Sequence, residues 1–130
     1  MTDSRVHPVL RSFDFLGGKE GSGAGLGGSQ RFVDANPKAA QALFLAIEDA
    51  MALIARDPRR AAEIYLTSEP QKLSNEEVQT LLQDHSTIYQ VAPSGLMAYA
   101  EFMVKTGMLK TKPDSWKDVF FPYVYERGGD

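Results

Sequence analysis

The stretch "NPKAAQALFLAIEDAMALIAR", from Asn36 to Arg56, carries the clearest structural signal in the chain. Its apolar residues recur every three or four positions, a spacing typical of an amphipathic helix. They are Ala40, Leu43, Phe44, Ile47, Ala50, Met51 and Ile54, and the polar residues Gln41, Glu48, Asp49 and Arg56 fall on the other face. Asn36 can cap such a helix and Pro37 suits its first position. We therefore expect one long helix from Pro37.

Working outward, similar start signals recur. Asp57-Pro58 repeats the cap-then-proline pattern and predicts a second helix. Ser74 and Glu77 have the spacing of a capping box ahead of a third. Between Leu82 and Pro93 the segment "HSTIYQVAP" is expected to be extended.

The C-terminal third gives weaker signals. Pro93 predicts the start of a fourth helix and Gly107 its end, as a residue just past the C-cap. Ser115 with Asp118 predicts a cap on a last short helix, which Pro122 is expected to stop. The sequence from residue 36 onward is thus mainly helical.

Composition narrows the class of protein. The 130 residues suffice for one small domain, and 43% of them are hydrophobic, which is ordinary for a globular protein. A net charge of −3 and the lack of a basic run argue against nucleic acid as a partner. There is no cysteine, which excludes a thiol nucleophile, a disulfide framework and a thiolate metal site.

Targeting signals are not evident. No run reaches the ~18 apolar residues of a membrane span, so no membrane insertion is expected. The start "MTDSRVHPVL" lacks the charged-then-apolar layout of a signal peptide, and the chain as written would stay in the cytoplasm.

The stretch "GSGAGLGG", Gly21 to Gly28, contains the pattern GxGxxG found in dinucleotide-binding folds. That motif needs a strand before it and a helix directly after it, whose N–H groups face the phosphate. Pro8 interrupts the preceding apolar run, and the sequence after Gly28 predicts no helix before Asn36. We therefore expect a flexible linker and no NAD, FAD, ATP or other cofactor.

No catalytic constellation emerges, so we assign no catalytic, cofactor-binding or metal-ligating residue, and the ligand-binding residues stay unknown. The two histidines, His7 and His85, lack partners at metal-ligand spacing. The carboxylate pairs Glu48-Asp49 and Glu76-Glu77 fall on a polar helix face and in a first helical turn, where a structural role is favoured. The chain is predicted not to be an enzyme.

Five aromatic residues gather near the C-terminus. They are Trp116, Phe120, Phe121, Tyr123 and Tyr125. Such a group can form a recognition patch, but it more often pins a terminal segment to the core.

Together, several segments resemble the late part of the solute-binding proteins of ABC transporters, of the nitrate/sulfonate/taurine type. The relevant pieces are the Phe32 to Pro37 pattern F-x-x-x-N-P before an alanine-rich helix, "LSNEEVQTLL", "YQVAPSGLMAYAEFMVKTGMLKTKP" and "SWKDVFFP". Their order and spacing over roughly a hundred residues carry the resemblance. It covers nearly all of this chain, but only the C-terminal part of such a protein.

The resemblance implies an α/β fold of the type II periplasmic-binding-protein kind, of which this chain would be a mainly α-helical fragment with at most one or two short strands. Residues 1–16 would lead back from the second lobe, 17–30 form the Gly-rich linker, and 31–130 form the helical C-terminal part of one lobe. The family has an apolar strand where this chain has "KEGSGAGLGGSQ". The glycine run therefore resembles a replaced core strand, in a natural fragment, a damaged gene product or an engineered chain.

Function follows from the same resemblance. It implies a periplasmic or extracellular fragment of a solute-binding protein, with a small anionic or zwitterionic solute and an ABC permease as partners, and unable to bind solute alone. An enzymatic branch of the family makes the pyrimidine precursor of thiamin, and nothing in these residues favours it. The alternative is a helical interaction module without a solute, in which an exposed apolar helix face drives self-association.

Overall fold

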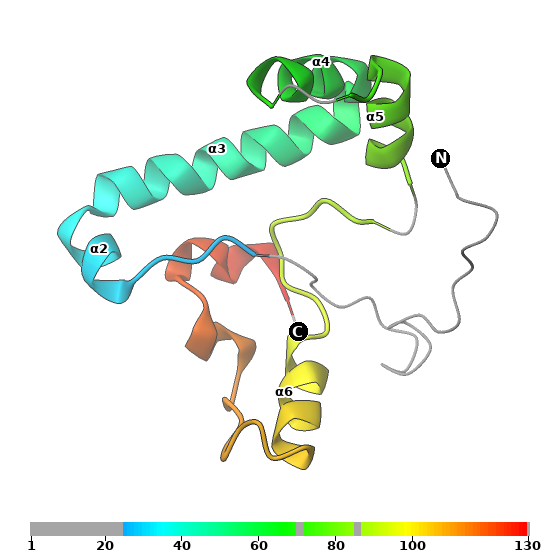
Figure 1. The fold of residues 1–130 in the computed structure, drawn as a ribbon. Helices are drawn as coiled ribbons and strands as arrows, with labels where there is room; N and C mark the ends of the chain where they lie inside the picture. The colour runs from blue at the N-terminus through cyan, green and yellow to red at the C-terminus, as the bar shows by residue number, and fades with distance from the viewer. Residues whose placement is uncertain (1–24, 70–71, 85–86, 130) are drawn as a thin grey trace. The chain divides into compact units, whose positions relative to one another are not determined.

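The computed structural model describes residues 25–69, 72–84 and 87–129 (Figure 1). The chain divides into two compact units. We call Gly28–Val91 the helical unit. The other, which we call the C-terminal unit, takes the described parts of Met1–Gly27 and Ala92–Asp130.

The helical unit opens with a helix that the sequence did not predict. α2 spans Gln30–Ala35 and begins two residues after Gly28. The Ser29 hydroxyl caps it by accepting a hydrogen bond from the Phe32 amide at 3.2 Å. The expectation of no helix between Gly28 and Asn36 is therefore wrong.

The long helix α3 spans Pro37–Arg56, as the apolar periodicity predicted. The expected role of Asn36 is wrong, however, because its side chain makes no cap to α3. It ends α2 instead, and its side-chain amide donates to the Phe32 carbonyl at 3.0 Å. Pro37 alone starts α3, since its fixed φ fits a first helical position and it has no N–H to satisfy.

The next two helices begin where their caps predicted. α4 spans Pro58–Ser68, and the Asp57 carboxylate accepts from the Arg60 amide at 3.0 Å. α5 spans Asn75–Leu82 behind a complete capping box. There the Ser74 hydroxyl accepts from the Glu77 amide at 3.2 Å, while the Glu77 carboxylate accepts from the Ser74 amide at 2.9 Å. Each exchange satisfies a backbone donor that the helix itself leaves unpaired.

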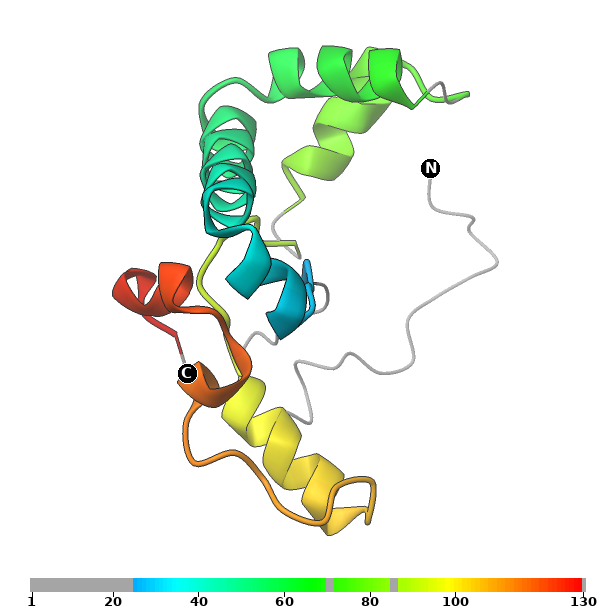
Figure 2. The same cartoon turned by 90° about the vertical axis from the view of Figure 1, so that its left-hand side faces the viewer.

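Packing within the helical unit gathers at one end of α3. α4 contacts both α3 and α5, and both views place α4 and α5 together beside the C-terminal end of α3 (Figures 1 and 2). Ala61 and Ala62 on α4 and Val78 on α5 are buried. Small side chains at this crossing allow the helices to approach closely, so the core here is narrow.

In the C-terminal unit, α6 spans Leu96–Lys105 and starts three residues later than Pro93 predicted. Gly95 precedes it with φ +68°, a left-handed conformation that glycine adopts without strain. The predicted end at Gly107 is confirmed. Gly107 has φ +78°, its amide donates to Val104, and the Met108 amide donates to Met103, which together form a Schellman motif.

The aromatic C-terminus is ordered by short 3-10 helices. η1 spans Trp116–Val119, and Ser115 and Asp118 form the predicted capping box around it. η1 ends at Val119, so Pro122 does not stop it; Pro122 instead begins a further helix, η2, which spans Pro122–Arg127. The Tyr125 hydroxyl donates to the carbonyls of Lys117 and Phe120, at 2.8 and 3.1 Å, and thereby fixes η2 against η1.

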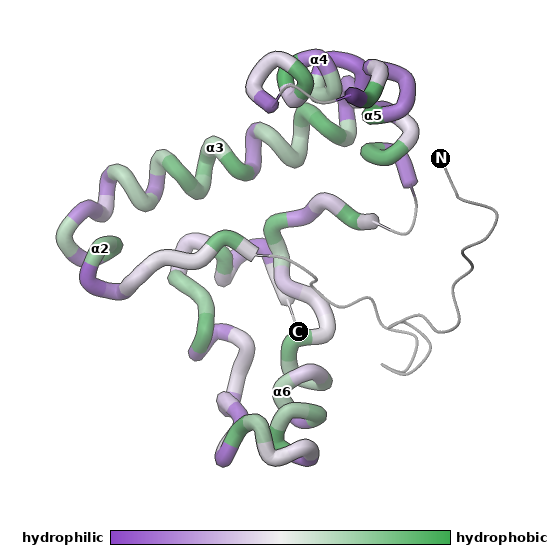
Figure 3. Tube along the Cα trace, viewed as in Figure 1, coloured by the Kyte–Doolittle hydropathy of each residue, from purple (hydrophilic) through white to green (hydrophobic). Residues whose placement is uncertain are grey.

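The core is small relative to the apolar content of the chain. The buried apolar residues in the described ranges are Ala40, Ala61, Ala62, Val78, Ala100 and Trp116. Apolar residues run along much of α3 (Figure 3), yet Leu43 and Leu45 are 49% and 48% exposed. The helices therefore leave much apolar surface open to solvent.

The secondary structure is mainly helical, as predicted, and the residues described contain no strand. Of the predicted segments, 1–16 and the part of 17–30 before Gly25 fall outside those residues; residues 25–29 carry no regular structure, and Gln30 already belongs to α2. In the ranges that are described, no helix has the length and apolarity that a membrane span requires.

We expect α5 to respond to acid through its capping box. Hydrogen bonds from the Ser74 amide and hydroxyl lower the pKa of Glu77 below its ordinary value. Because the folded-state pKa is the lower one, the box stabilises the folded chain above the ordinary carboxyl pKa, and this is lost as the pH falls through the lowered value. An NMR titration should show the Ser74 amide shift changing with that lowered midpoint. In Glu77→Gln the step should vanish, and an unchanged step would contradict this assignment.

We expect Gly129→Ala to destabilise the C-terminal unit. A Cβ at this position would lie 2.8 Å from Pro93 Cγ and 3.0 Å from the Trp116 ring, at φ +150°. Crowding and strain of this kind cost roughly 1–3 kcal/mol. Thermal unfolding followed by Trp116 fluorescence should show a lower midpoint.

The matched control for this change is Gly27→Ala, whose Cβ would meet nothing within 4 Å. Its unfolding midpoint should stay within error of the parent. Equal midpoints for both variants would show that the contact of Gly129 with Pro93 and Trp116 does not form.

Candidate functional site

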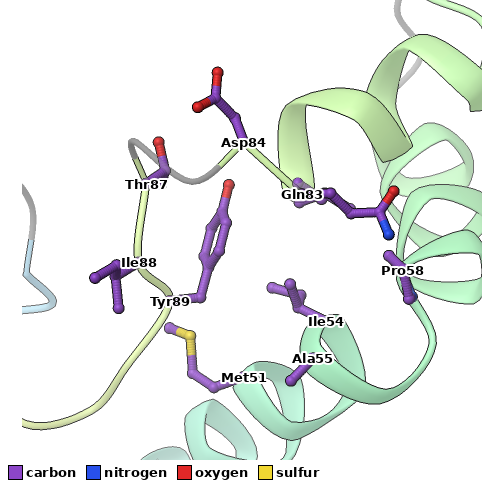
Figure 4. A pocket seen from close by; sticks show the side chains of 10 residues that line it. Met51, Ile54, Ala55, Pro58, Gln83, Asp84, Thr87, Ile88 and Tyr89 are labelled. Carbon is purple, nitrogen blue, oxygen red and sulfur yellow. The ribbon is translucent and has the colours of Figure 1, made fainter.

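The helical unit contains an apolar hollow of about 450 Å³, beside the C-terminal end of α3 (Figure 4). It lies where α3 gives way to α4, next to the end of α5 and the extended segment that follows. Its lining residues are Met51, Ile54, Ala55, Pro58, Leu82, Gln83, Asp84, Thr87, Ile88 and Tyr89. The hollow is widely open to solvent.

The apolar side of the hollow comes from the inner face of α3. Met51 and Ile54 stand one turn apart on that face and are half-buried. Pro58 closes the end because it begins α4 directly after the break at Asp57. Because of the break α4 does not continue along the axis of α3, and the hollow opens beside the last turn of α3.

The opposite side comes from the extended segment after α5. In Figure 4 the ring of Tyr89 stands in the hollow opposite Ile54. The side chain of Ile88 points to the opposite side of the segment, away from Tyr89. Tyr89 is 37% exposed, so its ring covers the apolar side chains only in part. The Thr87 amide donates to the Asp84 carbonyl at 3.0 Å, which ties the start of the segment to the residues after α5.

Polar groups lie at the rim. Gln83 contributes an amide and Thr87 a hydroxyl, while the Asp84 carboxylate is directed away from Ile54 (Figure 4). The hollow can therefore hold an apolar group and offer neutral hydrogen-bonding partners at its edge. Among the described residues that line it, Asp84 is the one carboxylate.

A second, polar hollow lies between α4 and α5, lined by Arg59, Glu63, Asn75, Glu76 and Gln79. Four of its five side chains pair within the hollow, Arg59 with Glu63 and Gln79 with Asn75. Arg59 and Arg60 lie 3.5 and 3.0 Å from the Glu63 carboxylate, and the Gln79 amide donates to Asn75. These exposed pairs satisfy the local charges and contribute little stability.

One argument against a phosphate site at the glycine run no longer holds, because a helix, α2, does follow Gly28. α2 has only six residues, however, and the Ser29 hydroxyl already accepts from its Phe32 amide. A Cβ at Gly25 or Gly27 would meet nothing within 4 Å, so neither glycine is required by a close approach. The segment before residue 25 lies outside the described residues. The expectation of no cofactor stays a prediction.

The remaining sequence candidates are placed as follows. Glu76 and Glu77 lie in the first turn of α5, where Glu77 serves the capping box. Glu48 is half-buried and Asp49 exposed on α3. Within the described residues no three His, Asp or Glu side chains come together as metal ligands. Both histidines lie outside those residues.

Two of the aromatic residues near the C-terminus, Phe120 and Tyr125, form a compact group around Trp116. Phe120 and Tyr125 contact its ring edge-to-face, at centroid distances of 6.0 and 5.8 Å. The Lys117 ammonium lies 5.7 Å from the Trp116 centroid and 5.3 Å from that of Tyr125. Because Trp116 is only 9% exposed, its ring holds the terminal segment in place and is not open to a ligand.

Comparison with models of known protein families, with curated proteins and with solved structures found no match to this chain.

We expect Ala55→Trp to block the apolar hollow. Ala55 is exposed and lines the hollow, so an indole there fills it without displacing a buried side chain. Fluorescence of the uncharged dye Nile red should fall, while far-UV circular dichroism stays unchanged. Ala50→Trp, exposed on α3 and outside the lining, is the matched control. Equal dye binding by both variants would rule out the hollow as the apolar site.

Proposed function

We propose that this chain is the helical C-terminal part of a solute-binding protein of an ABC importer, of the nitrate/sulfonate/taurine type. The resemblance of motifs ordered over roughly a hundred residues supports the assignment. Three of those motifs supply helix starts, at Pro37, at Ser74 with Glu77, and at Ser115 with Asp118. Motifs of this kind specify packing and capping, so they identify no solute-contacting residue.

The observation that carries the proposal is the open apolar surface of the helices. Leu43 on α3 and Ile64 and Tyr65 on α4 are 49%, 43% and 43% exposed. A helix with this much apolar surface is stabilised by packing against another layer. In the proposed α/β fold that layer is a sheet, supplied by the N-terminal part of a lobe.

Such a role is transport, without catalysis. The partners are a small anionic or zwitterionic solute and the membrane permease, and the compartment is the periplasm or the cell exterior. Since the cleft of a two-lobed binding protein needs both lobes, the isolated chain binds no solute.

The second candidate is a helical interaction module. The same exposed side chains favour it, because an apolar surface can be covered by a partner protein or by a second copy as well as by a sheet. The two candidates differ in one respect: only the transport role links the covering of α3 to a solute.

A complementation experiment tests the transport role. The chain is co-expressed with the complementary N-terminal part of a nitrate/sulfonate/taurine-type binding protein. We expect the two pieces to co-purify and their melting temperature to rise with nitrate or taurine, because a ligand stabilises only the state that binds it. The chain alone should show no such rise.

The control compares two exposed positions of α3. Leu43→Lys places a charge on the apolar side and should prevent co-purification, whereas Gln41→Lys on the polar side should not. Failure of the parent chain to form a complex would contradict the transport role. If the complex forms equally well with Leu43→Lys and with Gln41→Lys, the apolar side of α3 does not make the contact with the N-terminal part.

A further inference from the structure

The side of α3 that faces away from Ala40, its one buried residue, carries a distinct pattern of residues. Lys38, Ala42, Leu45 and Asp49, which we call the outer stripe, are all exposed. At 100° per residue they fall within about 60° of one another around the helix axis. The inner residues Ala40 and Ile47 lie on the opposite side, so the outer stripe is separate from the face that a sheet would cover.

The exposure of Leu45 on the polar side of α3 calls for an explanation. Leu45 is 48% exposed in the middle of the polar side of α3, and Ala42 lies one turn before it on the same side. A single exposed leucine is ordinary on a protein surface. Here, however, the small Ala42 leaves room for a side chain of another helix beside Leu45, and charged residues of opposite sign stand at the two ends of the stripe.

The stripe is complementary to itself. Consider a second copy of α3 that runs antiparallel to the first, related to it by a two-fold axis at the level midway between residues 43 and 44. Position 38 of one helix then faces position 49 of the other, and position 42 faces position 45. An antiparallel second helix therefore sets Lys38 against Asp49 twice, and Leu45 against Ala42 twice. The two charges are eleven residues apart, about 16 Å along the axis, which matches them in one register only.

Neither charged residue is engaged elsewhere in the described chain. The ion pairs found there join Arg59 and Arg60 to Glu63 and Lys112 to Glu101, and Lys38 and Asp49 form none with another described residue. Both side chains are therefore available to a partner.

We propose that α3 pairs antiparallel with α3 of a second copy of this chain, through the outer stripe. The contact is isologous, as two-fold dimers are. It spans the first 14 residues of a 20-residue helix, so the dimer is a weak one below the standard interface size. Leu45 supplies the apolar contact, and the exposed ion pairs set the direction and register of the helices. The proposal does not rest on the proposed function, since the opposite face serves that.

Charge reversal tests this pairing by sedimentation equilibrium across a dilution series. Lys38→Asp alone and Asp49→Lys alone each turn both symmetric pairs from attraction to repulsion, and each should weaken self-association by about tenfold. An equimolar mixture of the two variants restores both pairs, so association should return to the parent level. Raised salt should weaken the parent dimer.

Two further variants complete the test. Leu45→Asp should abolish association at all concentrations. Lys110→Asp, exposed in the C-terminal unit and with the same change in charge as Lys38→Asp, should leave it unchanged. Far-UV circular dichroism checks that each variant keeps its helix content.

The outcomes separate clearly. Restoration by the mixture supports the antiparallel pair in this register. A parent chain that is monomeric at every concentration overturns the proposal, and so does association that persists unchanged in both single variants. The latter result would place the contact on another face, such as that of Leu43.

Discussion

The break at Asp57-Pro58 is the constraint on which the helical unit depends. In a continuing helix the ring of Pro58 would clash with the Ile54 carbonyl, and its missing N–H would leave that carbonyl unpaired. Asp57 takes a non-helical conformation, with φ −144° and ψ 74°, and its carboxylate caps the next helix at the Arg60 amide. Residues 37–68 are thereby divided into two helices. α4 then contacts both α3 and α5, and the C-terminal end of α3 lies beside the hollow.

The sequence predicted helices well where two local signals coincide. Proline with a cap residue located α4, and the reciprocal Ser74–Glu77 pair located α5, because both act within a few residues and need no tertiary partner. Single signals did worse. Pro93 was read as a helix start, yet the chain continues to Gly95, whose left-handed conformation precedes α6. α2 was missed because its six residues carry little apolar periodicity, although Ser29 was a readable cap.

Features made by residues distant in sequence could not be predicted. η2 is fixed by hydrogen bonds from Tyr125 back to Lys117 and Phe120, which no local pattern shows. The apolar hollow is lined from α3, α4, α5 and the segment after it. Periodicity put Met51 and Ile54 on one face, but gave no reason for Tyr89 to lie opposite them. Residues that share a face can be predicted from one element, whereas the space between elements depends on how they pack.

The aromatic group around Trp116 also makes the two units distinguishable by spectroscopy. Trp116 is the one tryptophan of the chain, and it lies in the C-terminal unit among Phe120, Tyr125 and the Lys117 ammonium. The helical unit holds the 20 residues of α3 and therefore most of the amide dipoles that are aligned over several turns. Tryptophan emission consequently reports the melting of one unit, while the far-UV signal is weighted towards the other. If the two curves separate on heating, the chain has two independent folding units; if they coincide, some interaction couples them.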